Sequence, residues 1–281
     1  MNRAGWPARP ALPWIIVALA LVVGMPGPAP AQSLSIGGEN SKFPMEVFSD
    51  EGIEWEQDRK VFTARGNARA VRGEVTITAD LLRAYYREKS GGGTDIWRLD
   101  AEGKVKVSSP GETAFGETAT YDVDNAILVF KGRKVRFLTA EDEITADQQL
   151  EYWETKQIAV ARGNAHAVRG AKRLRADILS AHFRKDKHGK TKVYRIDAFD
   201  NVYIVSEQDT ITADRGVYDV ESGIATLTGS VKLSRDANQL NGCSAVVNLN
   251  TGISKLKSCA STGGGTSRVQ GIFRPGTVKR K

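Results

Sequence analysis

Apolar and polar positions alternate on both sides of a glycine that recurs roughly every 30 to 37 residues. We call each such position a mark, and the marks divide the body of the chain into six similar segments. Positions two and four residues before and after each mark are apolar or small, and at the third mark one extra residue shifts the later pair. A period of two predicts β-strands with one buried face. Because the phase survives each mark, we predict long strands that bend sharply there. The marks are Gly66, Gly103, Gly132, Gly163, Asp200 (by register) and Gly229.

The inward positions of these strands are the candidate binding residues. They are Phe62, Ala68, Ala70, Leu99, Val105, Val107, Leu128, Phe130, Val135, Phe137, Ala165, Ala167, Ile196, Val202, Ile204, Leu227, Val231 and Leu233. Four are alanines, where a closed core favours bulk. Either space is reserved for a ligand, or two sheet faces pack closely there. On the opposite phase we expect solvent-facing side chains, namely Arg69, Lys106, Arg136, His166 and Lys232.

The chain contains an internal duplication. The segment ARGNARAVRG at Ala64–Gly73 returns as ARGNAHAVRG at Ala161–Gly170, 97 residues later, and the register continues without a gap. Internal repeats of this kind indicate stacked copies of one structural unit. We expect one β-domain over residues 32–259, with copies at approximately 46–150 and 151–247.

A second phrase, Ile-Thr-Ala-Asp, occurs at Ile77–Asp80, Ile144–Asp147 and Ile211–Asp214. Aspartates at matching places suggest a metal ladder, but Asp side chains more often accept hydrogen bonds from backbone donors at turns. We therefore predict that each Asp supports the turn that follows it, and that no metal is bound.

The N-terminus has the pattern of a secretory signal peptide over residues 1–31. Arg3 and Arg9 precede an apolar run from Trp14 to Val23, and Ala29-Pro30-Ala31 offers small residues for cleavage. About a dozen apolar residues fall short of the ~20 that a membrane-spanning helix needs, which disfavours an uncleaved anchor. The mature chain is expected in the periplasm.

The formal charge of +7 belongs to the termini. Seven basic residues lie within residues 1–31 and 260–281, which contain no acid, and between them 33 basic residues face 33 acidic ones. Nucleic-acid binding requires a basic face on the folded domain, so no nucleic-acid partner is expected. Residues 260–281 are rich in Gly, Ser, Thr, Lys and Arg and are predicted to be a flexible basic tail, for which weak contact with anionic lipid is an alternative role.

Two cysteines, Cys243 and Cys259, bracket a predicted hairpin with Asn250-Thr251-Gly252 at its turn. In an oxidising compartment such a pair favours a disulfide over two buried thiols. A simple register centred on Thr251 would place Lys255 on the face of the apolar residues, so a bulge or a shifted turn is required.

Catalytic patterns are missing from the sequence. The histidines fall on an outward strand position, a strand end and a charged loop (His166, His182 and His188) without a Ser, Cys or metal-type partner at fixed spacing. No phosphate-binding loop occurs. A pair of carboxylates for glycoside hydrolysis stays an alternative, because acids from different strands can meet in space. We expect a protein that is not an enzyme and needs no cofactor.

These strands and phrases resemble the OstA-like, or LptA-like, periplasmic lipopolysaccharide-transport family. The resemblance rests on the glycine-x-apolar-x-apolar strands and on Ile-Thr-Ala-Asp phrases followed by Tyr, as at Ile211–Asp214 and Tyr218, and it covers roughly Glu46 to Val247. It implies an all-β, elongated, open V-shaped β-jelly roll of repeated antiparallel strands. It also implies a carrier that shields lipid A acyl chains in an apolar groove and bridges the inner and outer membranes.

The resemblance further implies partners: lipopolysaccharide, an LptC-like inner-membrane protein and an LptD-like outer-membrane protein, bound through edge strands, and head-to-tail copies of the chain. The candidate edges lie near Glu46–Trp55 and Ile253–Cys259. An apolar groove is also favoured on physical grounds, because exposing a lipid acyl chain to water costs about 0.8 kcal/mol per methylene. Two alternatives stay open: a structural or adhesive β-solenoid that binds protein or glycan outside, and an LptC-like membrane-anchored component.

Overall fold

The structure of the protein is a computed structural model, which describes residues 36, 43–89, 91–187, 191–206, 209–259 and 268–273. Within these residues the regular structure is β-strand throughout, which confirms the all-β prediction. The strands are β1 (Glu46–Phe48), β2 (Gly52–Glu56), β3 (Val61–Arg72), β4 (Val75–Glu88), β5 (Thr94–Ser109), β6 (Glu112–Asp122), β7 (Ile127–Lys131), β8 (Val135–Leu138), β9 (Asp142–Ala146), β10 (Gln149–Trp153), β11 (Ile158–Arg169), β12 (Lys172–Lys185), β13 (Thr191–Val205), β14 (Asp209–Asp219), β15 (Ile224–Arg235), β16 (Asn238–Asn248), β17 (Ile253–Lys257) and β18 (Gln270–Ile272). The expected signal peptide lies outside the described residues.

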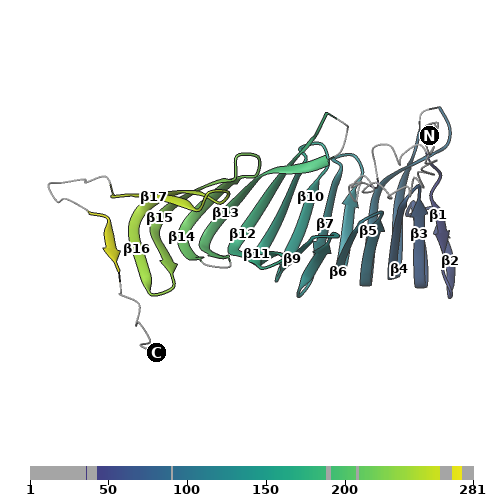
Figure 1. Ribbon diagram of the computed structural model, residues 1–281. Helices are drawn as coiled ribbons and strands as arrows, with labels where there is room; N and C mark the ends of the chain where they lie inside the picture. Colours follow the sequence, from purple (N-terminus) through teal and green to yellow (C-terminus); the bar gives the residue numbers. More distant parts are fainter. Residues whose placement is uncertain are drawn as a thin grey trace, which may run out of the picture.

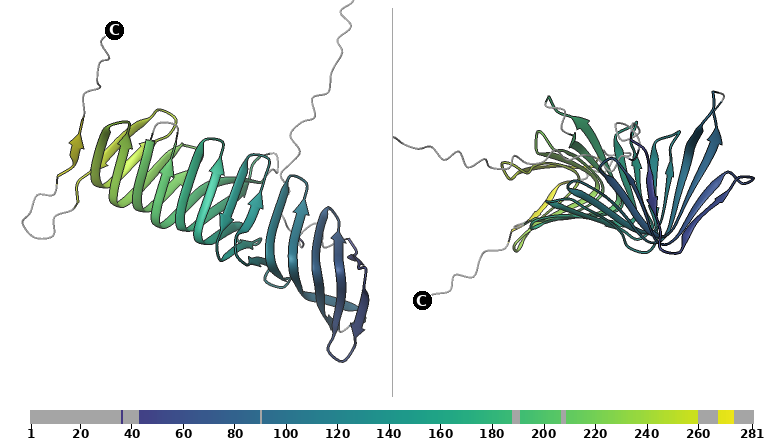
Figure 2. Two further views of the ribbon diagram at one scale, coloured as in Figure 1. Left: turned by 90° about the horizontal axis from the view of Figure 1, so that it is seen from below. Right: turned by 90° about the vertical axis from the view of Figure 1, so that its right-hand side faces the viewer.

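The eighteen strands form one antiparallel sheet in which most consecutive strands pair with each other. Where a bend divides a strand, the two pieces pair with the same neighbour, as β7 and β8 do with β6. The result is an elongated molecule with β1 and β2 at one end and β16 to β18 at the other (Figure 1). Viewed along its length, the strands spread from a common line into a V (Figure 2, right). We call the arm that contains β2, β7, β10 and β17 the first arm, and the arm that contains β1, β8, β9 and β18 the second arm. The longer strands run through both.

The V arises from the bends that the glycine marks predict. Gly66 and Asn67 inside β3 both have positive φ, at 73° and 44°, and the pairing with β4 slips between Arg65 and Ala68. Left-handed backbone of this kind is accessible to Gly and tolerated by Asn. The same paired geometry recurs at the marks of β5, β11, β13 and β15. Continuous bent strands are therefore confirmed at five marks.

The third mark differs from the prediction. Residues Gly132 to Lys134 separate β7 from β8, so no single strand runs through this bend. Because this segment has one extra residue, it does not form the two-residue bend, and the strand pairing is interrupted. Gly132 has a φ of 134°, whereas the φ values of the other marks lie near 80° or below.

Carboxylates line the outside of the bends and, together with the bend residues, form what we call the corner ridge. A Cβ placed on Gly103 would collide with the Asp80 carboxylate, and one on Gly229 with Asp214. Asp177, which ends Leu174-Arg175-Ala176-Asp177, a variant of the Ile-Thr-Ala-Asp phrase, accepts a hydrogen bond from Asn201 Nδ2 at 2.8 Å. The Ile-Thr-Ala-Asp aspartates therefore pack on the bend of the next strand. The prediction that they support a following turn is wrong for Asp80 and Asp214, which lie inside β4 and β14 rather than before a turn. Asp147 does follow the end of β9, and it accepts a hydrogen bond from Asn164 Nδ2 at 3.0 Å.

The core is one apolar cluster that extends along the inside of the V through both copies. Ala68, Val107 and Ala165 have no exposed area, and Val231 is 1% exposed. On the opposite phase Arg69, Lys106, Arg136 and Lys232 are exposed, as predicted, and His166 is half-buried. The phase of the sequence thus gives the two faces correctly.

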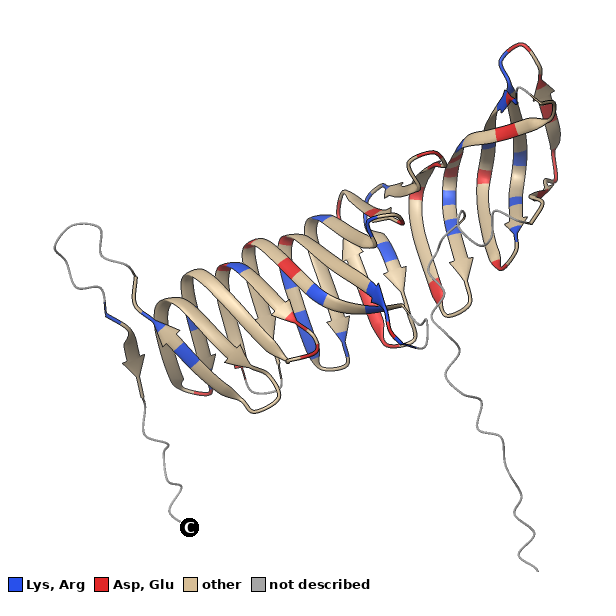
Figure 3. Ribbon diagram, turned by 90° about the horizontal axis from the view of Figure 1, so that it is seen from above, with Lys and Arg blue, Asp and Glu red and all other residues tan. Residues whose placement is uncertain are grey.

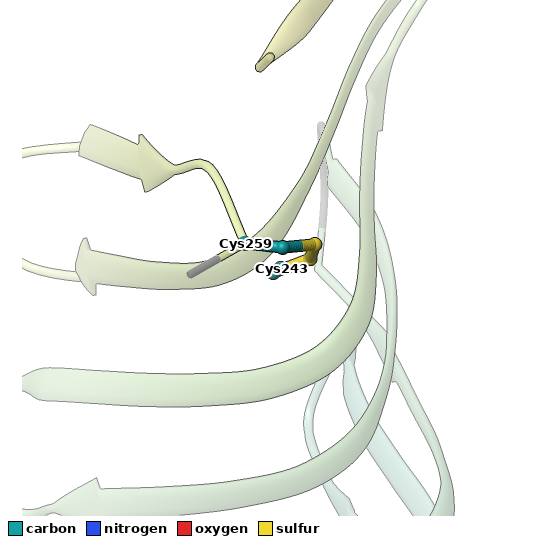
Figure 4. Close-up of a disulfide and its surroundings, with 2 residues drawn as sticks. All are labelled: Cys243 and Cys259. Atoms are coloured by element: carbon teal, nitrogen blue, oxygen red, sulfur yellow. A yellow bond between two sulfur atoms is a disulfide. The ribbon is translucent and has the colours of Figure 1, made fainter. Parts of the chain in front are cut away.

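The C-terminal end is closed by the predicted disulfide. Cys243, at the bend of β16, is bonded to Cys259, just beyond β17, with a Cα–Cα distance of 4.9 Å (Figure 4). Val246 pairs with Lys255 and Val247 with Ser254, so the turn spans four residues and Lys255 faces outward. This shifted turn resolves the register problem. The expected flexible tail requires a correction, because Gln270–Ile272 form β18 against β16.

Candidate functional site

The inside of the V contains a cavity of about 330 Å³ in the first copy, beneath the strands that run from β1 to β7. It is lined almost wholly by apolar side chains, including Met45 just before β1, Val47 from β1, Ile77 from β4 and Tyr121 from β6. Ile36, which precedes the first strand and is 1% exposed, forms part of the wall. The bends create this space because they hold two apolar faces apart near the rim and together near the corner ridge.

Five of the predicted groove residues line this cavity: Phe62, Ala70, Leu99, Val107 and Leu128. The other predicted residues point inward, but they are not part of its wall. Those that belong to the continuous apolar cluster or pack against it are Ala68, Val105, Phe130, Val135, Phe137, Ala165, Ala167, Val202, Ile204, Leu227, Val231 and Leu233. Ile196, also inward by register, is half-buried.

The alanines separate into two kinds. Ala68 and Ala165 lie directly beside a bend and are fully buried, because the two arms meet there. Farther from the bend, Ala70, Ala101 and Ala119 face the cavity. Close packing of the sheet faces therefore holds at the bend, and space opens toward the rim.

Sequence analysis missed the contribution of the intervening strands. Ile77 and Leu82 on β4 and Ala119 and Tyr121 on β6 line the cavity, yet these strands carry no glycine mark. The available signal was the Ile and Ala of the Ile-Thr-Ala-Asp phrase, which share a face. Ile36 had no comparable signal.

Two charged residues, Arg83 and Asp100, are among those that border the cavity, and both form ion pairs on the outer phase of the sheet. Arg83 bonds to Glu102 at 2.5 Å, and Asp100 accepts bonds from Arg98 at 2.8 Å and Thr120 at 3.0 Å. All three pairs lie on the outer phase of the sheet. The interior thus presents hydrocarbon, and its polar neighbours are satisfied outside.

A row of ionic contacts crosses the outer face of the first arm. Cross-strand pairing links Asp100 through Thr120 and Val129 to Glu151, and then through Val160 and Ser180 to Asp197. Asp197 is 5% exposed and binds Arg195 at 2.8 Å and His182 at 2.7 Å. These contacts tie neighbouring strands, and the sequence spacing did not reveal them.

The carboxylate of Glu151 lies in an enclosed environment that shifts its pKa. Burial raises its pKa, but hydrogen bonds from Arg162 (2.6 Å), Trp153 (2.9 Å) and Gln149 (2.6 Å) outweigh burial and leave it below its ordinary value. The ionised form is therefore the one that the fold stabilises.

Among the described residues, no cluster of three or more His, Cys, Asp and Glu side chains is placed to hold a metal ion. His182 is engaged by Asp197 through Nε2, and His188 lies outside the described residues. Within the same residues no helix has the length and apolarity to span a membrane.

Comparison with known proteins identifies the family. A family model described as LptA/(LptD N-terminal domain) LPS transport protein matches residues 46–148 and again residues 143–253. The chain belongs to this family of lipopolysaccharide-transport proteins. The two matches fall on the two copies that the 97-residue repeat predicts.

The chain is also similar to two individual proteins. An uncharacterized protein of Rhizobium meliloti (strain 1021) is 32% identical over 97 residues, which cover 33% of this chain and 51% of that protein. The chain therefore spans about half the length of that relative. LptH of Pseudomonas aeruginosa, whose crystal structure is described as the LptA homologous periplasmic component of the lipopolysaccharide transport device, is 10% identical. The match covers 85% of this chain and 100% of LptH at a TM-score of 0.22, which is too loose to add to the family match.

Proposed function

We propose that the protein is a periplasmic carrier that holds the acyl chains of lipopolysaccharide inside the V and passes the lipid toward the outer membrane. Membership of a lipopolysaccharide-transport family supports this function. The observation that carries the finer proposal is the apolar cavity of about 330 Å³ between the arms. Each methylene moved from water into such a cavity gains roughly 0.8 kcal/mol.

The cavity also favours a carrier over a structural or adhesive β-solenoid. A solenoid that binds partners on its outer surface gains nothing from internal space, since voids cost stability. An apolar cavity bordered by alanines, with every neighbouring charge satisfied outside, suits a hydrocarbon guest.

Photo-crosslinking in living cells tests the groove. The photoreactive residue p-benzoylphenylalanine replaces Phe137 or Ile204, which face inward, and the matched controls replace the adjacent outward residues Arg136 and Tyr203. We expect lipopolysaccharide adducts from the inward pair only. Adducts from the outward pair alone would exclude a lipid-filled V.

Partner binding is proposed to use the two ends of the sheet. Strands β1 and β2 pair with β3, and β17 and β18 pair with β16, so each end has a free strand edge among the described strands. Ile53 and Trp55 at one end and Ile253 at the other are more than half exposed, at 52%, 56% and 59%. An exposed edge with apolar side chains is suited to β-augmentation by a like domain. LptC-like and LptD-like proteins and further copies of this chain are the proposed partners.

Mixing experiments test these edges. Ile253→Asp and Trp55→Asp should each weaken association at one end only, measured by size-exclusion chromatography with an isolated partner domain. If both variants associate as strongly as the natural protein does, these strands are excluded as the docking edges.

A further inference from the structure

The inside of the V, which we call the trough, is covered to different extents in the two copies. Ala70 and Tyr121 in the first copy are 6% and 2% exposed. Their counterparts 97 residues later, Ala167 and Tyr218, are the same residue types and are partly exposed. Ala70 and Ala167 belong to the second arm, and the two tyrosines belong to the first. Both walls of the trough are therefore more open in the second copy than in the first.

Residues that precede β1 cover the trough of the first copy. Ile36 is 1% exposed, Met45 packs against the apolar cluster, and both border the cavity. The carbonyl oxygen of Phe43 accepts a hydrogen bond from Arg72 Nε at 3.2 Å, which holds this part of the chain at the rim of the second arm. In the second copy the counterpart of Met45 is Asp142, and burying a carboxylate over an apolar surface is costly. The second copy therefore lacks the apolar cover at this position.

The inner rim of the second arm also differs between the copies. In the first copy Val75, which begins β4, is 1% exposed and belongs to the apolar cluster. Its counterpart Lys172, which begins β12, is exposed and has the inward phase of Leu174. Lys172 pairs across the hairpin with Arg169, whose Nε donates to Asp142 at 2.6 Å. The open part of the trough thus has a cation at its rim, where the covered part has an apolar side chain.

The two copies do not differ by one broad charged face. Acidic and basic residues are interspersed along both of them (Figure 3). A general attraction for anions therefore does not select one copy, and a preference depends on the cover and on the rim.

We propose that an anionic lipid binds first in the second copy, with its acyl chains in the open trough and an anionic headgroup oxygen at Lys172. The first copy accepts acyl chains only after Ile36 and Met45 leave the trough, because their side chains occupy the apolar surface that the chains require. The protein's own apolar side chains thus compete with the lipid in one copy only. This order of binding rests on the function proposed above, which requires only that the V holds acyl chains.

Lipid A that carries a diazirine in one acyl chain tests the order of binding in the full mature chain. With protein in excess over lipid, illumination is followed by digestion, and mass spectrometry counts the adducts on each strand. The counterpart regions to compare are β3 to β6 and β11 to β14. We expect at least about tenfold more label in β11 to β14, since burial of one Ile side chain shifts an equilibrium by about that factor or more.

Two variants separate the cover from the rim. Ile36→Ala should raise the label in β3 to β6 about tenfold and leave β11 to β14 unchanged, whereas Ile127→Ala, the same substitution on the outer phase of β7, should change neither region. Lys172→Val introduces the residue of the first copy and should lower the label in β11 to β14 about fivefold, the contribution of one basic residue near an anionic lipid. Its control is Lys106→Val, which removes an exposed lysine from the outer phase and should have no effect.

Equal label in the two copies of the natural protein, or more label in the first copy, overturns the proposal, and this comparison needs no variant. An Ile36→Ala variant that labels like the natural protein removes the cover from the argument, and equal effects of Lys172→Val and Lys106→Val remove the rim. No label on inward residues of either copy would instead reject the lipid-filled V itself, and with it the proposed function. Circular dichroism confirms that the variants are folded.

Discussion

The packing of an acid on each bend makes a prediction that two glycines separate cleanly. Gly103 in the bend of β5 and Gly111 in the turn between β5 and β6 have nearly the same φ, 78° and 83°. A Cβ on Gly103 would collide with the Asp80 side chain, whereas a Cβ on Gly111 meets open space. Substitution by Ala therefore imposes the same backbone cost at both sites and a collision at only one.

The magnitudes follow from these geometries. A left-handed backbone costs an L-residue about 1–2 kcal/mol, which is the whole expected loss for Gly111→Ala. In Gly103→Ala the Asp80 side chain must also move and give up its 3.4 Å contact with Lys104, an exposed pair worth under about 1 kcal/mol. We expect Gly103→Ala to lose about 2–3 kcal/mol of unfolding free energy in total, a fall in Tm of roughly 4–12 °C for a domain of this size.

Urea unfolding of the single and double variants measures the coupling. Asp80→Ala/Gly103→Ala should lose no more than Gly111→Ala plus the cost of Asp80→Ala alone, because the collision is gone. If Gly103→Ala and Gly111→Ala cost the same, and Asp80→Ala combines additively with Gly103→Ala, the acid does not pack on the bend in the way inferred, and the corner ridge is incidental.

Three further predictions concern the C-terminal clamp, the buried carboxylate and the cavity. Replacing Cys243 and Cys259 by Ser opens a loop of 16 residues, and hydrogen exchange of Ile253–Lys257 should report a loss of about 3 kcal/mol of protection; unchanged exchange would show that pairing with β16 alone holds β17. Glu151 has a depressed folded pKa, so its stabilising contribution is present above the unfolded pKa of about 4.3 and is lost as pH falls through the folded pKa. Glu151→Gln should therefore flatten the fall in stability on acidification, seen in Tm measured from pH 7 to pH 3, and an equally steep fall would contradict the assignment. Ala119→Leu should fill the cavity, leave Tm unchanged or raised, and lower the amount of lipopolysaccharide that co-purifies. Ile36→Ala should instead enlarge the cavity and lower Tm. If the Ala119→Leu variant retains as much lipopolysaccharide as the natural protein, the lipid binds elsewhere.

Local sequence was sufficient for the strands, their faces and their bends. Alternation of apolar and polar residues fixes which side chains point inward, and this held on both sides of Gly66 and Gly163 because a two-residue bend preserves the phase. At Gly132 the prediction of one continuous strand failed, because one extra residue divides the strand, although Val135 and Phe137 still point inward as predicted. The proximity of two cysteines across a short hairpin also sufficed for the disulfide.

The tertiary structure decided what depends on distance between strands. The cavity exists because the arms diverge away from the corner ridge, and no periodicity reports how far apart two faces stand. The ion pairs of Asp197 depend on cross-strand register, which is set by bends and turn lengths together. Residues such as Ile36 and Tyr121, which carry no repeat signal, become part of the site only when the chain is folded. The sequence thus determined which way each side chain points, because that orientation depends on the local backbone. The folded sheet determined which residues each side chain contacts, because those residues come from other strands.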